Sequence, residues 1–284
     1  HKDTKKSWCL GVFVVMVLSR FDSPKAYWEM NSEPRTARSP LIVIGGPTGV
    51  GKTDVAVELA ARCSGEIISA DSMQVYRQLD IGTSKPTAEQ CRGVPYHGVD
   101  LIEPGASFSA GAFIELADLL IAEINARGRQ PIVVGGTGLY MKGLLQGVFE
   151  APRVDRSVRK RLLERVAAEG APALHAELAR VDPEAAAHIS PNDPIRITRA
   201  LEVWEQTGQP ITHMWRQWRS DRSRYPYYLF VLTCERSLLY ERINRRVEKM
   251  FGMGLADELR RLVAQGVSPT CHAFKALGYR HVLA

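Results

Sequence analysis

Residues 41–53 read Leu41-Ile42-Val43-Ile44-Gly45-Gly46-Pro47-Thr48-Gly49-Val50-Gly51-Lys52-Thr53, an apolar run that leads into the P-loop pattern. In this pattern the glycines let backbone N–H groups approach phosphate oxygens, the lysine adds a positive charge, and the hydroxyl can hold Mg²⁺. The apolar run predicts a strand, and residues 54–62 predict the helix that should follow the loop. The chain is therefore predicted to bind a diphosphate or a triphosphate.

The length and the charge of the chain limit its class. Its 284 residues are enough for an α/β core with an inserted second unit, and its 45% hydrophobic content is ordinary for a globular protein. The whole net charge of +6 falls in residues 150–284, which hold 22 Lys and Arg against 16 Asp and Glu. A basic half suggests a polyanionic partner such as nucleic acid, and from charge alone a solvated basic surface explains it equally well.

The cysteines argue against a disulfide framework and against a zinc site. There are five of them, scattered along the chain, and none forms a Cys-x-x-Cys pair. This usage is typical of reduced thiols in a cytosolic protein, so we expect a cytoplasmic location.

Residues 1–39 differ from the rest of the sequence. The apolar run Trp8 to Leu18 is too short to span a bilayer, and no Ala-x-Ala cleavage pattern follows it. We therefore expect no membrane segment. We expect residues 1–39 to be an N-terminal extension that is non-native or disordered. Residues 1–29 are expected to come from a mis-set start or a partial record, with the working protein beginning near Met30.

The hydrophobic pattern predicts the α/β class, as a P-loop NTPase-like parallel sheet flanked by helices, with a small inserted α-helical domain. We expect the first part of the catalytic core at residues 40–150, the helical insertion at 151–210, and the second part of the core at 211–284. Strands are predicted at 66–71, 131–134 and 227–233. Predicted helices lie at 113–126, 139–145, 153–169, 173–180, 183–188, 195–206 and, with a break near Gly252 and Gly254, at 237–265.

Asp71 is the leading acidic residue of the predicted site. It follows a buried strand, and in a parallel sheet the carboxyl ends of strands share the edge at which the P-loop opens. The strand at 131–134 runs into the turn Gly135-Gly136-Thr137-Gly138 and offers no carboxylate for the Walker B position, which holds Mg²⁺ in ATPases. The alternative for Asp71 is a helix N-cap, since Ser72 could begin a helix.

Two basic segments have an open interpretation. Arg242, Arg245 and Arg246 lie on neighbouring parts of one predicted helix surface, which suits phosphate contact and an ordinary solvated face equally well. Trp215 and Trp218 alternate with arginines, as in single-stranded nucleic-acid sites and also at an amphipathic helix edge.

The chain resembles the tRNA dimethylallyltransferases, also called tRNA isopentenyltransferases, over about residues 40–284. The motifs that carry the resemblance are Gly46-Pro47-Thr48-Gly49-Val50-Gly51-Lys52-Thr53, Ser69-Ala70-Asp71-Ser72-Met73-Gln74-Val75-Tyr76, Asp80-Ile81-Gly82-Thr83-Ser84-Lys85-Pro86, Gly135-Gly136-Thr137-Gly138-Leu139-Tyr140, Asn192-Asp193-Pro194-Ile195-Arg196-Ile197-Thr198-Arg199-Ala200-Leu201-Glu202 and Leu277-Gly278-Tyr279-Arg280. The chain departs from many relatives at Ile195, where they carry Gln, and it stops at Ala284, where bacterial relatives continue for a further helix.

The resemblance implies transfer of a dimethylallyl group from dimethylallyl diphosphate to N6 of adenosine 37, beside the anticodon of tRNAs that read codons beginning with U. It implies Mg²⁺ as the cofactor, a monomeric enzyme, and a tRNA anticodon stem-loop as the partner, contacted by the helical insertion. The missing Walker B acid fits this chemistry, because the diphosphate is a leaving group and no hydrolytic water is needed. The enzyme is expected to flip the target adenine out of its stack.

The resemblance also implies roles for individual residues. The catalytic residues are Asp71 as the general base, Thr137 near the reacting base, Arg242 at the diphosphate, and Lys52. The diphosphate- or nucleotide-binding residues are Gly46, Pro47, Thr48, Gly49, Val50, Gly51, Lys52 and Thr53, and Thr53 also holds Mg²⁺. The tRNA-binding residues are Asp71, Ser72, Met73, Gln74, Thr137, Arg159, Ile195, Arg196, Ile197, Thr198 and Arg199.

Three other functions compete with this one. An adenylate isopentenyltransferase would use the same donor with a free nucleotide as acceptor, and the helical insertion and the basic second half argue against it. A small-molecule P-loop kinase would transfer the γ-phosphate of ATP. A chain without activity could still be a tRNA-binding module.

Overall fold

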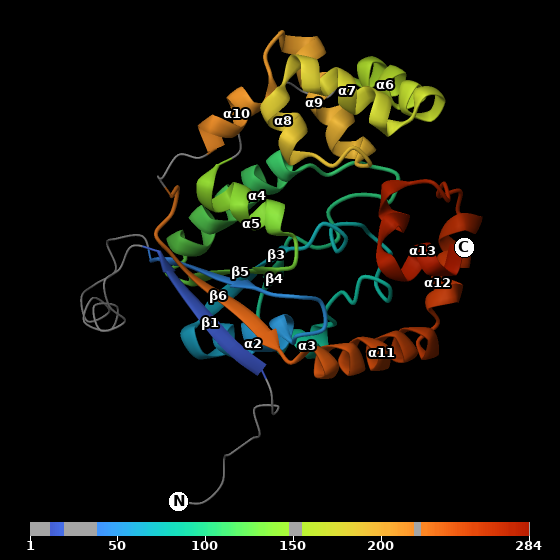
Figure 1. The fold of residues 1–284 in the computed structure, drawn as a ribbon. Coiled ribbons are helices and arrows are strands. Elements are labelled where there is room, and N and C mark those ends of the chain that lie inside the picture. Colours follow the sequence, from blue (N-terminus) through green and yellow to red (C-terminus); the bar gives the residue numbers. More distant parts are fainter. Residues whose placement is uncertain (1–11, 20–38, 148–154, 219–222, 284) are drawn as a thin grey trace, which may run out of the picture. The chain divides into compact units, whose positions relative to one another are not determined.

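The structure, a computed structural model, describes residues 12–19, 39–147, 155–218 and 223–283. The chain forms two compact units (Figure 1). The first comprises residues 1–145 and 225–284 and holds the sheet, and the second comprises residues 146–224 and is helical. The helical unit includes Ile211–Trp218, beyond the predicted boundary at residue 210, because Ile211 and Met214 pack into its core.

The first unit is built on a six-stranded sheet of order β1-β6-β2-β5-β3-β4. The strands are β1 (Val12–Ser19), β2 (Leu41–Gly45), β3 (Gly65–Ala70), β4 (Tyr96–His97), β5 (Gln130–Gly135) and β6 (Tyr227–Cys234). Strands β2 to β6 are parallel, which confirms the predicted fold class. Strand β1 pairs antiparallel with β6 over its full length, so residues 12–19 of the predicted N-terminal extension form an edge strand of the sheet.

Helices cover both faces of the sheet because alternate strand residues point to opposite sides. Leu41, Val43 and Val133 pack against α4 (Ala110–Ala126) and α5 (Gly138–Gln146). Ile42, Ile44 and Ile132 pack against α2 (Lys52–Cys63) on the other face. Figure 1 shows α4 and α5 on one side of the sheet and α2 on the other. These strands are apolar throughout because both faces are buried.

The remaining elements of the first unit are α3 (Ala88–Cys91), α11 (Arg236–Gly252), α12 (Leu255–Ala264), a 3₁₀ turn (His272–Lys275) and α13 (Leu277–Leu283). Helix α11 follows β6 directly, so its first turns lie at the carboxyl edge of the sheet (Figure 1). Helices α12 and α13 pack with residues 73–81 in a separate apolar cluster. In the described part of the chain, no helix is both long and apolar enough to cross a bilayer.

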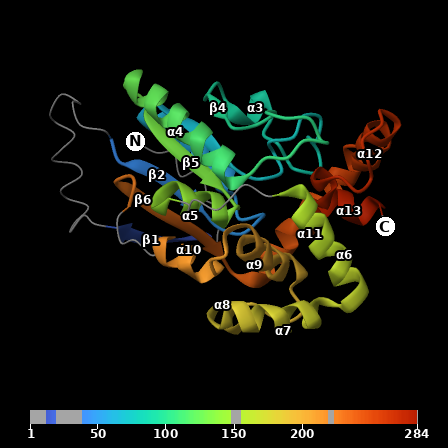
Figure 2. The same ribbon diagram turned by 90° about the horizontal axis from the view of Figure 1, so that it is seen from above.

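The helical unit consists of α6 (Arg156–Glu169), α7 (Ala171–Val181), α8 (Pro183–His188), α9 (Pro194–Thr207) and α10 (Ile211–Trp218), seen from a second side in Figure 2. Its core contains Leu162, Leu174, Leu178, Ile197 and Leu201. Buried Asp182 caps α8 and accepts hydrogen bonds from the backbone N–H and the hydroxyl of Thr212, which ties α10 to this core. Trp215 packs against the same core, which supports the amphipathic interpretation for that residue. The side chain of Trp218 lies outside the described residues.

Candidate active site

Four segments meet at the carboxyl edge of the parallel strands. The P-loop follows β2, Asp71 follows β3, the turn at residues 135–138 follows β5, and α11 follows β6. They line a cavity of about 840 Å³ that includes Lys52, Thr53, Asp71, Arg242 and Arg246. The crossover connections of a parallel sheet bring these residues together, although they are spread over most of the chain.

Close contact between backbones requires glycine at two points of this edge. Gly46 has φ +144°, and a Cβ there would lie 2.5 Å from the carbonyl oxygen of Leu232 on β6. A Cβ on Gly135 would lie 2.1 Å from the carbonyl oxygen of Ala70 on β3. Both distances are shorter than a van der Waals contact, so a side chain at either position would push apart the strands that support the site.

The P-loop presents its lysine to the cavity. Helix α2 begins at Lys52, so the positive end of its dipole faces the loop. The Lys52 ammonium group donates to the carbonyl oxygens of Gly46 and Pro47, at 2.9 and 2.8 Å. Burial lowers the pKa of Lys52, an effect that nearby Asp71 opposes and nearby Arg246 reinforces. The loop therefore holds a partly desolvated cation that gains most from an anionic ligand.

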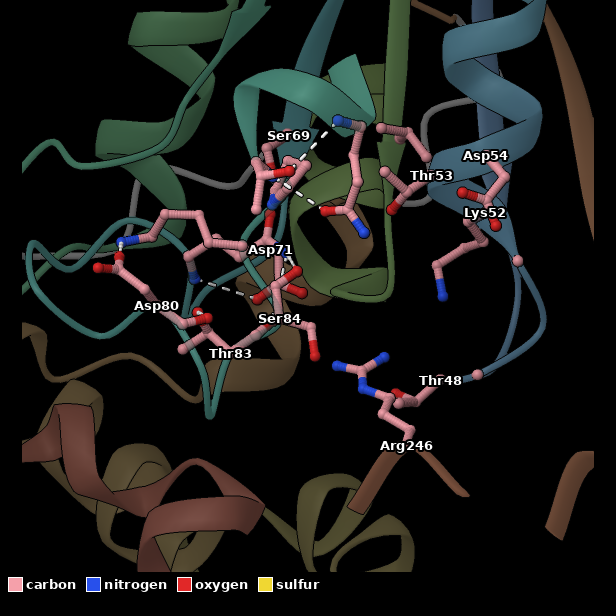
Figure 3. Close-up of a pocket in the computed structure, with 18 of the residues that line it drawn as sticks. Thr48, Lys52, Thr53, Asp54, Ser69, Asp71, Asp80, Thr83, Ser84 and Arg246 are labelled. Atoms are coloured by element: carbon pink, nitrogen blue, oxygen red, sulfur yellow. Dashed lines mark hydrogen bonds and ion pairs between the residues drawn. The ribbon is translucent and has the colours of Figure 1, made fainter. Parts of the chain in front are cut away.

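Asp71 begins a turn and also borders the cavity. Its Oδ1 accepts from the backbone N–H of Met73 at 2.8 Å and of Gln74 at 3.4 Å. This is the capping role considered as an alternative, but it occupies one oxygen only. Among the described residues no group donates a hydrogen bond to Oδ2. Figure 3 shows the side chains of Lys52 and Arg246 on one side of Asp71, so the carboxylate can cap the turn with one oxygen and still accept a proton on the other.

Sequence reasoning named Arg246 in a cluster with Arg242 and Arg245 but assigned a role at the diphosphate only to Arg242. The guanidinium of Arg246 is half-buried beside Asp71, and burial lowers its pKa despite that carboxylate. Figure 3 shows its side chain extending into the cavity. Arg242 lines the cavity too, whereas Arg245 is exposed and pairs with Glu241 at 2.6 Å. Because residues four apart share a helix face, the spacing of Arg242 and Arg246 was the signal available in the sequence.

Thr137 lies beside Asp71 but supports a turn. Its Oγ1 accepts from the backbone N–H of Ser72 at 3.0 Å and donates to the Ser72 hydroxyl at 3.3 Å. Its own N–H donates to the carbonyl oxygen of Ala70. These contacts fix the turn that carries Asp71 against the turn that follows β5.

The loop at residues 80–85 forms one wall of the cavity, and buried residues hold it in place. Gln74 donates to the carbonyl oxygens of Thr83 and Ser84. The buried carboxylate of Glu258, on α12, accepts from the backbone N–H groups of residues 80, 81 and 82. The hydroxyl of Tyr279, on α13, donates to Glu258 and accepts from Gly82 at 3.1 Å. We call this group the Glu258–Tyr279 latch.

The predicted tRNA-binding residues of the helical unit fall into two groups. Ile195, 75% exposed, and Arg196 lie at the surface, and Arg159 and Arg199 are partly exposed. Ile197 and Thr198, 0% and 3% exposed, are buried in the helical core. One helix turn therefore has both an exposed and a buried face, and Ile197 and Thr198 lie on the buried one. That these two residues bind tRNA stays a prediction.

The protein oxygens of this cavity suit Mg²⁺ only when a bound ligand such as a diphosphate supplies further oxygens. No cluster of three or more His, Cys, Asp or Glu side chains that could hold a metal occurs among the described residues. Thr53 lines the cavity at the start of α2, where a diphosphate would supply further oxygens. Mg²⁺ is commonly held in this way, by few protein oxygens together with phosphate and water.

Comparison with known proteins agrees with this geometry. Residues 74–284 match a family profile described as IPP transferase, and residues 39–103 match one described as isopentenyl transferase. The tRNA dimethylallyltransferase of Geobacter sulfurreducens is 44% identical over 248 residues, which cover 87% of this chain and 80% of the relative. That of Myxococcus xanthus is 47% identical over 244 residues, which cover 86% and 79%.

Two solved structures are also similar. A tRNA isopentenylpyrophosphate transferase from Bacillus halodurans has a TM-score of 0.57 and 43% identity, covering 86% of this chain and 76% of that one. A eukaryotic dimethylallyltransferase acting on tRNA has a TM-score of 0.73 and 27% identity, covering 86% and 63%. The sheet, the P-loop cavity and these relatives lead to one conclusion: the chain belongs to the IPP transferase family of prenyl transferases.

Proposed function

We propose that the enzyme transfers a dimethylallyl group from dimethylallyl diphosphate to N6 of adenosine 37 in tRNAs that read codons beginning with U. The observation that carries the proposal is the position of Asp71, a carboxylate with one uncommitted oxygen, beside Lys52 of the P-loop and Arg246 of α11. The names of the relatives favour this reaction over a P-loop kinase and over transfer to a free nucleotide.

In the reaction, N6 of the adenine attacks the allylic carbon that bears the diphosphate. The carbon–oxygen bond breaks, and its electron pair leaves with the diphosphate. Asp71 accepts the N6 proton, and Lys52, Arg242 and Arg246 stabilise the negative charge that grows on the leaving group. Thr53 and the P-loop at residues 46–53 would hold Mg²⁺ and the diphosphate, and the ion would neutralise part of the same charge.

The residues that we assign to the tRNA acceptor are chosen by where they lie in the structure. Ser72, Met73 and Gln74 follow Asp71 directly, and Gln74 lines the cavity. Thr137 acts through Ser72, whose position it fixes by two hydrogen bonds. On the helical unit, Arg159, Arg196 and Arg199 supply positive charge for the RNA backbone, and exposed Ile195 supplies apolar surface. We assign the enzyme to the cytoplasm as a monomer, because its RNA substrate is used there and one chain holds the whole set of proposed groups.

The test uses purified enzyme, dimethylallyl diphosphate, Mg²⁺ and an anticodon stem-loop with adenosine at position 37. The matched control stem-loop carries guanosine at that position, and free AMP is offered in a third reaction. Mass analysis of the nucleosides should find the prenyl group on adenosine 37 only. Transfer to AMP with an unmodified stem-loop would show an adenylate isopentenyltransferase, and binding without transfer would show a tRNA-binding module.

A further inference from the structure

Glu202 is a fully buried carboxylate in the helical unit, with no exposed surface. It lies on α9 among the core residues Leu201 and Val203. A charged group in such a place is unfavourable unless it is paired. Its Oε2 accepts from Nη2 of Arg159, on α6, at 2.8 Å and from Nη1 of Arg199, on α9, at 2.9 Å.

The two arginines meet at one oxygen atom. Their donor nitrogens are therefore at most about 6 Å apart. At this separation two positive charges repel each other, and the attraction of both to the anion between them offsets that repulsion. The side chains of Arg159 and Arg199 remain 39% and 25% exposed, so both guanidinium groups reach the surface from a buried anchor. Nearby Arg196 differs, because its partner Asp193 lies near the surface and its own side chain is 69% exposed.

A surface that binds phosphate gains from cations whose positions are fixed in advance, because less side-chain entropy is lost on binding. Glu202 supplies such a constraint to two arginines from two helices. It also cancels one of their two charges, an effect that by itself would weaken the attraction of RNA. The two effects of Glu202 on RNA binding therefore have opposite signs, which makes them separable by experiment.

We propose that Glu202 is a positioning residue for RNA recognition: it holds Arg159 and Arg199 as a preformed pair that contacts the phosphates of the tRNA. Both ion pairs are made by residues of the helical unit itself, so the constraint does not depend on a ligand. The inference rests on the proposed function, since the ligand is the tRNA of that reaction.

The experiment replaces Glu202 with Gln and measures the dissociation constant of the anticodon stem-loop over a series of salt concentrations. The charge-matched control is Glu177→Gln, which also removes one carboxylate from the helical unit but whose partner is Arg165, at 2.8 Å. The control should bind RNA as tightly as the parent enzyme or slightly more tightly. We expect Glu202→Gln to weaken binding roughly tenfold, the loss of about one charge-assisted hydrogen bond, despite its added positive charge.

Kinetics separate this role from a general loss of structure. Glu202→Gln should raise the KM for tRNA and leave kcat and the KM for dimethylallyl diphosphate within about twofold. Should melting curves show that this variant does not fold, Glu202→Asp replaces it, because it keeps the charge and shortens the reach toward both arginines.

RNA binding by the folded variant that equals or exceeds that of the parent enzyme overturns the positioning role. A parent enzyme that binds no stem-loop at all would instead contradict the proposed function, so the two failures are distinguishable.

Discussion

Asp71→Asn separates the two roles that the structure gives to Asp71. The side-chain carbonyl of Asn can still accept from the N–H groups of Met73 and Gln74, which now donate to Oδ1 at 2.8 and 3.4 Å. The turn should therefore survive. An amide cannot take up the N6 proton, so only the proposed acid–base role is lost.

The expected size of the effect follows from these roles. Loss of a general base lowers the rate typically by about 10²- to 10⁴-fold, which is about 3–5 kcal/mol in the activation barrier. The charge of Asp71 acts on Lys52 and on Arg246, and it would repel a diphosphate bound between them. The substitution removes that repulsion, so the KM for dimethylallyl diphosphate should stay constant or fall while kcat collapses.

The assay measures the rate of single-turnover transfer to a saturating stem-loop over a series of dimethylallyl diphosphate concentrations. Thermal unfolding of each variant is measured in parallel. Asp71→Ala is the control for the turn, because it also removes the acceptor of both N–H groups and should cost about 0.5–2 kcal/mol of stability, as the loss of a cap does. A folded Asp71→Asn enzyme with a rate within tenfold of the parent would refute the assignment of Asp71 as the base.

Three further variants test the rest of the site. Lys52→Met should raise the KM for dimethylallyl diphosphate at least tenfold and leave stem-loop affinity unchanged, since the cation faces the P-loop and not the RNA. A KM for dimethylallyl diphosphate equal to that of the parent enzyme would contradict this role. Thr53→Val should raise the Mg²⁺ concentration needed for half-maximal rate, and an unchanged Mg²⁺ titration would remove Thr53 as a ligand. Tyr279→Phe should lower stability by about 1.5–3 kcal/mol in urea unfolding, because the latch loses a hydrogen bond to a carboxylate. Burial beside Glu258 raises the pKa of Tyr279 above the ordinary 10.0, so the stability that Tyr279 contributes is fully present below pH 10 and is lost as the pH rises further. The free energy of unfolding of the parent should therefore fall more steeply above pH 10 than that of Tyr279→Phe. Parallel curves for the two proteins would show that the latch is not the cause of the fall.

The sequence alone predicted the parallel sheet and most helices, because each buried strand is a short apolar run and the glycine turns separate it from a helix. The helix predicted at 183–188 matches α8, and the predicted break near Gly252 and Gly254 separates α11 from α12. Strand β4 and helix α3 were missed, since elements of two and four residues carry too little periodicity to detect.

Site residues that belong to a local sequence motif could be predicted. Those whose place in the site depends on tertiary packing could not. The P-loop and Asp71 occur in continuous motifs next to strands. By contrast, only the direction of α11 shows that Arg246 enters the cavity while Arg245 does not. The burial of Ile197 and Thr198, and the sharing of Glu202 by two helices, likewise depend on how α6 and α9 pack.

The Glu258–Tyr279 latch also sets the order in which the enzyme matures. The loop at residues 80–82 is fastened by side chains that lie 176 to 197 positions later in the chain. At about 5–20 residues per second, the ribosome makes those side chains roughly 10–40 s after the loop. During that interval the nascent chain has its P-loop and Asp71 but lacks the support of one cavity wall. The catalytic pocket is thus completed late in synthesis, well after the ribosome has made the P-loop motif by which the site is recognised in the sequence.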